Sequence, residues 1–204
     1  MISSLHYISQ QTTAASHLEN IQSACEAGCR WIQLRIKNEP EETVLRSALA
    51  AKAICAAYNA TLIINDHPRI AVKVGAHGVH VGKQDMTVAA ARAITGSNFI
   101  IGGTANTLED ILTHVKEGAD YVGVGPYRFT KTKEKLSPIL GLEGIADMMQ
   151  ALKQRNIQIP VIAIGGILAA DVPALMQTGI HGIAVSGLIT HGENKSQTIL
   201  SITI

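Results

Sequence analysis

Three polar side chains that could bind a phosphate group alternate along one predicted strand and its exit. In the segment Gln33-Leu-Arg35-Ile-Lys37 the polar residues stand at every second position, so in a strand they share one face. Two cations side by side repel each other unless an anion joins them. The segment therefore favours an anion-binding site. Taken alone, it is also compatible with a polar strand end in water.

Two carboxylates follow the next predicted strands. Asp66 comes directly after Ile63-Ile64-Asn65, and Asp85 comes shortly after Val81-Gly82. Because adjacent strands bring their loops together, both carboxylates could reach one hard cation, and two carboxylates with water and substrate oxygens are typical of Mg²⁺. The alternative is that each aspartate caps the helix that follows it.

Two other regions have the composition of phosphate-binding loops. Gly123-Val-Gly125-Pro126 precedes Thr130-Lys131-Thr132-Lys133, a mixture of glycines, hydroxyls and ammonium groups that suits phosphate on a closing loop. A solvated lysine loop is the alternative. Gly165-Gly166 and Ser186-Gly187 follow later strands, where α/β barrels often hold a phosphate on backbone N–H groups. Simple turn glycines would give the same pattern.

An eight-residue pattern that begins with glycine occurs four times and indicates how these residues are positioned. In each copy the glycine follows an amphipathic stretch and precedes a β-branched run, as where a helix ends and a buried strand begins. The four copies start at Gly28, Gly75, Gly118 and Gly179. Their superposition places Gln33, His80, Gly123 and Ala184 at one strand position, and Arg35, Gly82, Gly125 and Ser186 at the next position on that face. Long polar groups are thus paired with small residues, which predicts a pocket.

Short apolar runs alternate with amphipathic segments along the whole chain. Strands are predicted at 5–9, 31–35, 61–64, 78–81, 99–102, 121–125, 161–164 and 182–186. Helices are predicted near 16–27, 40–58, 68–74, 87–95, 107–117, 143–155, 169–177 and 195–202. Eight strand–helix units predict an α/β fold, a single (β/α)8 TIM barrel over residues 1–204, whereas a flavodoxin-like open sheet would need only about five strands. Such barrels carry their chemistry on loops after the strands, and the longest loop, 125–141, suits a mobile lid.

Composition narrows the functional class. Of the 204 residues 47% are apolar, 3% are aromatic, and the net charge is +1, which argues against a nucleic-acid partner. The chain shows no signal peptide and no apolar run of membrane-spanning length, so we expect a cytoplasmic protein without a membrane partner. The three cysteines are expected to be reduced core residues. The eight histidines indicate no catalytic triad; only His80 lies at the predicted mouth, either as a core histidine or orienting an aspartate or an anion.

Together these motifs resemble the thiamine phosphate synthase family along essentially the whole chain. The matching segments are Gln33-Leu-Arg35-x-Lys37, Asn65-Asp66, Gly78-Val-His-x-Gly82-x-x-Asp85, Gly123-x-Gly-Pro, Thr130-x-Thr132-Lys133, Gly141-Leu-Glu-Gly144 and Ile164-Gly-Gly-Ile167. The resemblance implies a TIM barrel that joins hydroxymethylpyrimidine diphosphate to a thiazole phosphate, with Mg²⁺ as cofactor. Its partners would be small phosphorylated substrates, and a homo-oligomer is compatible with the sequence.

The resemblance also implies roles for individual residues. Gln33 would contact the pyrimidine, and Asn65 and Thr104 would assist in that site. The remaining assignments are Arg35, Lys37 and Lys133 as catalytic residues on the diphosphate, Asp66 and Asp85 as Mg²⁺ ligands, Thr130 and Thr132 on the thiazole phosphate, and Gly166, Ser186 and Gly187 around its phosphoryl group. The implied mechanism is dissociative: diphosphate leaves, and the thiazole nitrogen captures the pyrimidine methyl cation.

Three positions depart from the family pattern. Thr104 and Gly187 stand where serine is common, and Lys131 replaces a proline. A thiazole tautomerase on the same barrel is one rival function, although it needs no diphosphate site. A non-catalytic relative that binds thiamine phosphate or its precursors is the other rival.

Overall fold

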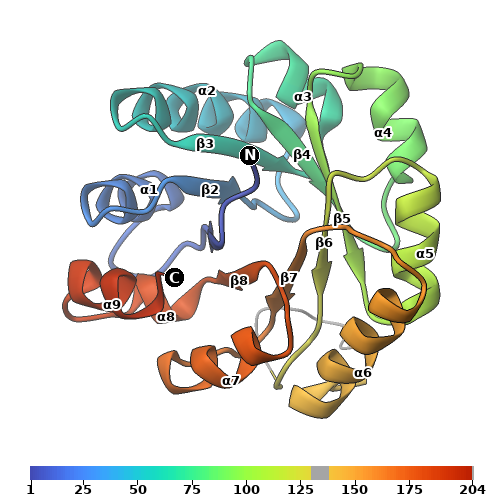
Figure 1. Ribbon diagram of the computed structural model, residues 1–204. Helices are drawn as coiled ribbons and strands as arrows, with labels where there is room; N and C mark the ends of the chain where they lie inside the picture. Colours follow the sequence, from blue (N-terminus) through green and yellow to red (C-terminus); the bar gives the residue numbers. More distant parts are fainter. Residues whose placement is uncertain (130–137, 204) are drawn as a thin grey trace.

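Eight parallel strands close into a barrel in the computed structural model, which describes residues 1–129 and 138–203 (Figure 1). Each strand pairs with the next along the chain, and β8 pairs with β1. The strands are β1 (Leu5–Ile8), β2 (Trp31–Leu34), β3 (Thr61–Asn65), β4 (Gly78–Val81), β5 (Ile100–Ala105), β6 (Tyr121–Val124), β7 (Val161–Ile164) and β8 (Gly182–Val185). The predicted (β/α)8 barrel is confirmed.

Helices surround the barrel on its outer side (Figure 1). They are α1 (His17–Glu26), α2 (Glu41–Ala57), α3 (Pro68–Lys73), α4 (Val88–Thr95), α5 (Leu108–Lys116), α6 (Gly141–Gln154), α7 (Val172–Gln177), α8 (Gly187–Thr190) and α9 (Lys195–Ile202), with a 3₁₀ turn η1 (Ala169–Asp171) before α7. The four glycines that open the repeats have φ between +62° and +106°. That left-handed conformation suits glycine and ends the preceding helix, as predicted.

Two elements differ from the sequence prediction. Strand β5 runs to Ala105, beyond the predicted end at Gly102, because its glycines admit neighbouring rings. A methyl group on Gly103 would lie 2.8 Å from the imidazole of His114, and the glycine pair therefore serves packing, not a turn. The short helix α8 directly after Ser186 was absent from the predicted helices.

The apolar core has two parts. The larger cluster lies between strands and helices, whereas a smaller one fills the barrel interior with Ile8, Trp31, Ile63, Tyr121, Ile162 and Ala184. The three cysteines are buried and free, as expected for core residues. In the described part of the chain, every helix is too short or too polar to cross a bilayer.

His6 predicts how stability responds to acid. Its ring stacks on Trp31 with centroids 4.4 Å apart, and burial lowers its pKa to about 3. The unfolded chain, with an ordinary histidine pKa near 6.5, therefore binds a proton that the folded protein excludes. Between these values His6 should make the free energy of unfolding fall by about 1.4 kcal/mol per pH unit as pH decreases. His6→Phe should flatten this slope in urea titrations at pH 4 to 7. An equal slope in both proteins would contradict the assignment.

Candidate active site

Side chains from β2 and β3 form a buried polar chain at the barrel mouth. Gln33 and Asn65 are only 4% and 6% exposed. The Gln33 amide donates to Oδ1 of Asn65 at 2.8 Å, and the Asn65 amide donates in turn to Oδ2 of Asp66. This continuous chain fixes the orientation of both amides, so Gln33 and Asn65, two of the three residues expected at the pyrimidine substrate, lie together.

The two predicted metal ligands share one cation in the structure. The ammonium group of Lys37 bonds the carboxylate of Asp66 and lies 3.7 Å from Oδ2 of Asp85. Oδ1 of Asp66 also accepts the backbone N–H of Gly82 at 3.2 Å. The two loops after β3 and β4 therefore bring both carboxylates to one place, as predicted.

The helix-cap alternative for these aspartates is wrong. Helix α3 has His67 at its N-cap and no side-chain cap hydrogen bond, and Asp66 points instead to Lys37. Helix α4 is capped by the hydroxyl of Thr87, which accepts from the N–H of Ala90.

The pKa values of Asp66 and Asp85 are shifted in opposite directions. Burial pushes the pKa of Asp66 up, but hydrogen bonds from Lys37 and with Asp85, and from the N–H of Gly82, outweigh it and leave that pKa lowered. Burial and the neighbouring charge of Asp66 raise the pKa of Asp85. A single ammonium thus leaves this pair short of positive charge, a condition that a divalent cation would relieve.

Among the described residues no cluster of three or more histidine, cysteine or acidic side chains is placed to hold a metal. Asp66 and Asp85 therefore fit only an ion that takes most of its ligands from water and substrate. Mg²⁺ has this coordination preference, since it keeps several waters and binds one or two carboxylates together with substrate phosphates.

Gly82 makes the room that Asp85 occupies. A methyl group at this glycine would overlap Oδ2 of Asp85 and lie 3.6 Å from Oδ1 of Asp66. We therefore expect Gly82→Ala to displace the Asp85 carboxylate and to raise the Mg²⁺ concentration for half-maximal activity about tenfold. Gly96→Ala would be a poor control, because Gly96 has a φ of +80°, a backbone conformation that strains alanine. The comparison variant is therefore Asp85→Asn, which removes the charge of the same carboxylate. The two variants should shift the metal titration similarly; an unchanged Mg²⁺ requirement in Gly82→Ala would contradict the prediction.

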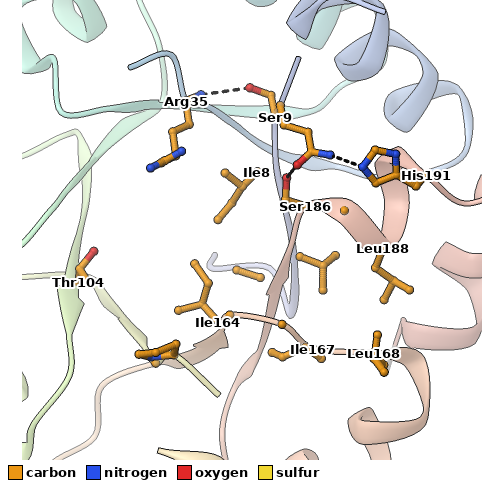
Figure 2. Close-up of a pocket in the computed structure, with 18 residues that line it drawn as sticks. Ile8, Ser9, Arg35, Thr104, Ile164, Ile167, Leu168, Ser186, Leu188 and His191 are labelled. Carbon is orange, nitrogen blue, oxygen red and sulfur yellow. Dashed lines mark hydrogen bonds between the residues drawn. The ribbon is translucent and has the colours of Figure 1, made fainter. Parts of the chain in front are cut away.

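A cavity of about 390 Å³ lies at the same end of the barrel as the carboxylate pair, at the ends of β1, β2 and β5 to β8 (Figure 2). Figure 2 shows Arg35 and Thr104 on one side, with Leu168, Leu188 and His191 on the other. Among the described residues no carboxylate forms an ion pair with the Arg35 guanidinium. An unneutralised cation facing a largely apolar wall suits an anionic ligand with an apolar body.

The turn after β7 is shaped by two glycines and an arginine. Gly165 and Gly166 have φ of +102° and +68°, and both line the cavity. The Arg128 guanidinium donates to the Gly166 carbonyl at 2.7 Å and pairs with both carboxylate oxygens of Asp171 at 2.9 Å. The hydrogen bond to the Gly166 carbonyl fixes the peptide unit between Gly166 and Ile167.

Gly187 lines the same cavity and begins α8. The first N–H groups of a helix have no acceptor within it, so they can bind an anion. The Ser186 hydroxyl, by contrast, donates to Oε1 of Gln10 at 3.0 Å. The structure thus favours backbone groups over this hydroxyl for any phosphate here.

His80 has the environment of a hydrogen-bonded core histidine. Its Nδ1 lies 3.1 Å from the Tyr121 hydroxyl, and its Nε2 lies 3.0 Å from Oγ1 of Thr104. A methyl group on Gly123 would lie 3.2 Å from this ring. The sequence predicted that the small residues of the repeat leave open pocket space. This prediction is wrong at Gly123 and Gly82, because neighbouring side chains fill the space beside them. It is confirmed at Ala184 and Ser186, which line the cavity.

Comparisons with known proteins show the family of the chain. The sequence pattern of the family described as thiamine monophosphate synthase matches residues 5–189. The chain belongs to this family. A thiamine-phosphate synthase from Bacteroides fragilis is 52% identical over 202 residues, covering 98% of this chain and 99% of the relative. One from Flavobacterium johnsoniae is 51% identical, covering 96% of this chain and 92% of the relative.

Solved structures are similar too. A thiamine phosphate pyrophosphorylase from Pyrococcus furiosus is 30% identical with a TM-score of 0.84, covering 97% of this chain and 92% of the other. A 3-hexulose-6-phosphate synthase, 18% identical with a TM-score of 0.70 and 98% coverage of both chains, shows the fold alone. As a thiamine monophosphate synthase family member at about half identity over nearly its full length, the chain is an enzyme, a transferase of thiamine biosynthesis.

The structure places most of the residues expected from the family at one mouth. Arg35, Thr104, Gly166, Ser186 and Gly187 line the cavity, and Gln33, Lys37, Asn65, Asp66 and Asp85 form the adjoining polar cluster. Thr130, Lys131, Thr132 and Lys133 lie outside the described residues, so their roles stay predictions.

Sequence reasoning missed the contribution of the first strand. Ser9 and Gln10 line the cavity, and Gln10 joins Ser186 to His191 through hydrogen bonds of 3.0 and 2.8 Å. The first strand lacks the glycine-led repeat, and therefore the superposition passed over it. The signal was available, since Ser9 and Gln10 follow β1 as Arg35 follows β2.

Proposed function

We propose that this enzyme joins 4-amino-2-methyl-5-(diphosphooxymethyl)pyrimidine to hydroxyethylthiazole phosphate, giving thiamine phosphate and diphosphate. The observation that carries the proposal is the joining of two different anion environments in one mouth. One is Lys37 with the carboxylate pair, which would bind an anion together with a divalent cation, and the other is the cavity with Arg35 and the glycine turns. A reaction between two phosphorylated substrates needs both.

The diphosphate would lie between Lys37 and Arg35. Asp66 and Asp85 would hold Mg²⁺, which when bound would neutralise charge on the diphosphate oxygens. Lys37 already contacts the carboxylates, so its ammonium stands where a diphosphate would join it. Arg35 offers a planar fork that matches phosphate oxygens, and Lys133 is proposed as a third cation.

The second substrate would occupy the apolar part of the cavity. Ile164, Ile167 and Leu188 would contact the thiazole ring. The N–H groups at Gly166 and Gly187 would bind its phosphoryl group, with Thr130 and Thr132 as further donors. The hydrogen bond of 2.8 Å from the Arg128 backbone N–H to the Gly165 carbonyl supports this, because that carbonyl belongs to the same peptide unit as the Gly166 N–H.

The mechanism that suits these residues is dissociative. Gln33 and Asn65, held by their mutual hydrogen bond, would orient the pyrimidine. As the C–O bond to diphosphate breaks, Arg35, Lys37 and Lys133 would stabilise the departing negative charge, and the thiazole nitrogen would then form the new C–N bond. No general base is needed for the bond exchange, and this supports the proposal because the charged side chains of the mouth would act by stabilising departing charge.

Turnover of the purified protein with both substrates and Mg²⁺ tests the proposal. We expect thiamine phosphate and diphosphate in equal amounts, measured by chromatography and a coupled diphosphate assay. Isomerisation of the thiazole precursor without use of the pyrimidine diphosphate would instead establish the tautomerase. Tight binding of both precursors without any product would establish the non-catalytic binder.

A further inference from the structure

Three side chains on neighbouring strands form a buried hydrogen-bond chain that ends at the cavity. Tyr121 on β6 contacts Nδ1 of His80 on β4, and Nε2 of His80 contacts the hydroxyl of Thr104 on β5. Thr104 lines the cavity, and Figure 2 shows its side chain on the same side as Arg35. The chain therefore connects the barrel interior with the place where we propose that the diphosphate binds.

Glycines make this arrangement sterically available. A methyl group on Gly102 would overlap the Tyr121 ring and lie 2.6 Å from Nδ1 of His80. Gly123 leaves room for the other edge of the imidazole. Glycines on two adjacent strands thus leave the space in which the Tyr121 and His80 rings meet.

The direction of each hydrogen bond follows from Tyr121. This residue is 1% exposed, and among the described residues its hydroxyl has one hydrogen-bond partner, Nδ1 of His80. A buried hydroxyl that lacks an acceptor is costly, so the O–H donates to that nitrogen. The nearby indole of Trp31 carries only a donor and offers no alternative.

The tautomer of His80 is then determined. An imidazole that accepts at Nδ1 carries its proton on Nε2. That N–H donates to Oγ1 of Thr104, and the threonine hydroxyl hydrogen must therefore point elsewhere. No described residue accepts it, and the open direction is the cavity that Thr104 lines.

The backbone of Thr104 is held as well. Nε2 of His114, on the outside of the barrel, contacts the Thr104 carbonyl at 2.9 Å. A β-branched side chain on a strand also has few χ1 rotamers. The threonine is thus restrained from both faces of β5.

We infer that Tyr121 and His80 are positioning residues that aim the Thr104 hydroxyl into the cavity as a hydrogen-bond donor to an anionic oxygen of the substrate. The identity of that oxygen, on the diphosphate, rests on the proposed function. The tautomer and the direction of the hydroxyl do not.

Nitrogen-15 NMR of the histidine rings tests the first step without any substrate. We expect wild-type His80, assigned through His80→Gln, to carry its proton on Nε2. Tyr121→Phe should give a mixture of both tautomers, whereas the control Tyr7→Phe, which also loses one buried hydroxyl bond, to Thr190 at 2.8 Å, should leave His80 unchanged. A proton on Nδ1 of the wild-type ring would overturn the inference, and this measurement decides even if Tyr121→Phe fails to fold.

A double-mutant cycle tests the second step. Tyr121→Phe should lower kcat about tenfold with a smaller change in KM for the pyrimidine diphosphate, since a misdirected donor loses part of its stabilisation of departing charge. In a Thr104→Val background the same substitution should cost less than twofold, because its target is gone. Additive losses would overturn the inference. Failure of the proposed function would appear differently, as no turnover by the wild type.

Discussion

Arg35→Ala should lower kcat/KM for the two-substrate reaction by about 10²- to 10³-fold. Among the described residues the guanidinium has no carboxylate partner, although it lines the cavity. A cation that no described carboxylate neutralises is available to the charge that develops on the diphosphate. The loss should fall mainly on kcat, because the diphosphate carries more negative charge in the transition state, as it leaves, than in the bound substrate.

Steady-state kinetics with each substrate varied in turn measures this effect. Arg35→Lys should recover part of the loss, since it restores the charge but not the planar fork. Arg46, exposed on α2 and not among the residues that line the cavity, gives a matched control in which Arg46→Ala removes the same charge outside the site. If Arg35→Ala changes only KM, Arg35 binds the ground state and is no part of catalysis.

Asp66→Asn should raise the Mg²⁺ concentration for half-maximal activity at least tenfold. Asp66 is the better held of the two carboxylates, with contacts to Lys37, Asn65 and the Gly82 N–H. The amide keeps the shape of the side chain but removes the charge that a hard cation prefers. Lys37 would also lose its closest ion-pair partner, so kcat at saturating Mg²⁺ should fall too.

Activity measured across a Mg²⁺ series in chelator-treated protein reports this shift, and calorimetry of Mg²⁺ binding reports it without turnover. The control is Asp147→Asn, an exposed acidic residue on α6. A metal requirement equal to that of the wild type would remove Asp66 from the proposed site.

The barrel was predictable because its signals are local. Apolar runs alternate with amphipathic segments in every unit, and a glycine that ends a helix marks four of the eight strands. Strand β5 shows the limit. The sequence prediction ended this strand at Gly102, yet the rings of Tyr121 and His114 fill the spaces beside Gly102 and Gly103 and the strand continues.

The site was predictable only where position along a strand determined it. Gln33 and Asn65 lie at the carboxyl ends of their strands, Asp66 follows directly, and the three meet as expected. Arg35 and Lys37 were expected to act together, but Lys37 turns to the aspartates while Arg35 lines the cavity. The direction in which such a side chain points depends on which carboxylates lie near it in the folded protein, and the spacing of residues in the sequence does not predict this.

The occupied glycine spaces have a consequence for anyone who wishes to change the substrate range. Gly82, Gly102 and Gly123 make room for a carboxylate, a phenol and an imidazole respectively, so we expect added bulk at these glycines to disturb the site. Leu168 and Leu188 face the cavity from loops and a short helix outside the sheet. Libraries that vary these two leucines should reach new thiazole analogues while the reacting end of the mouth keeps its geometry.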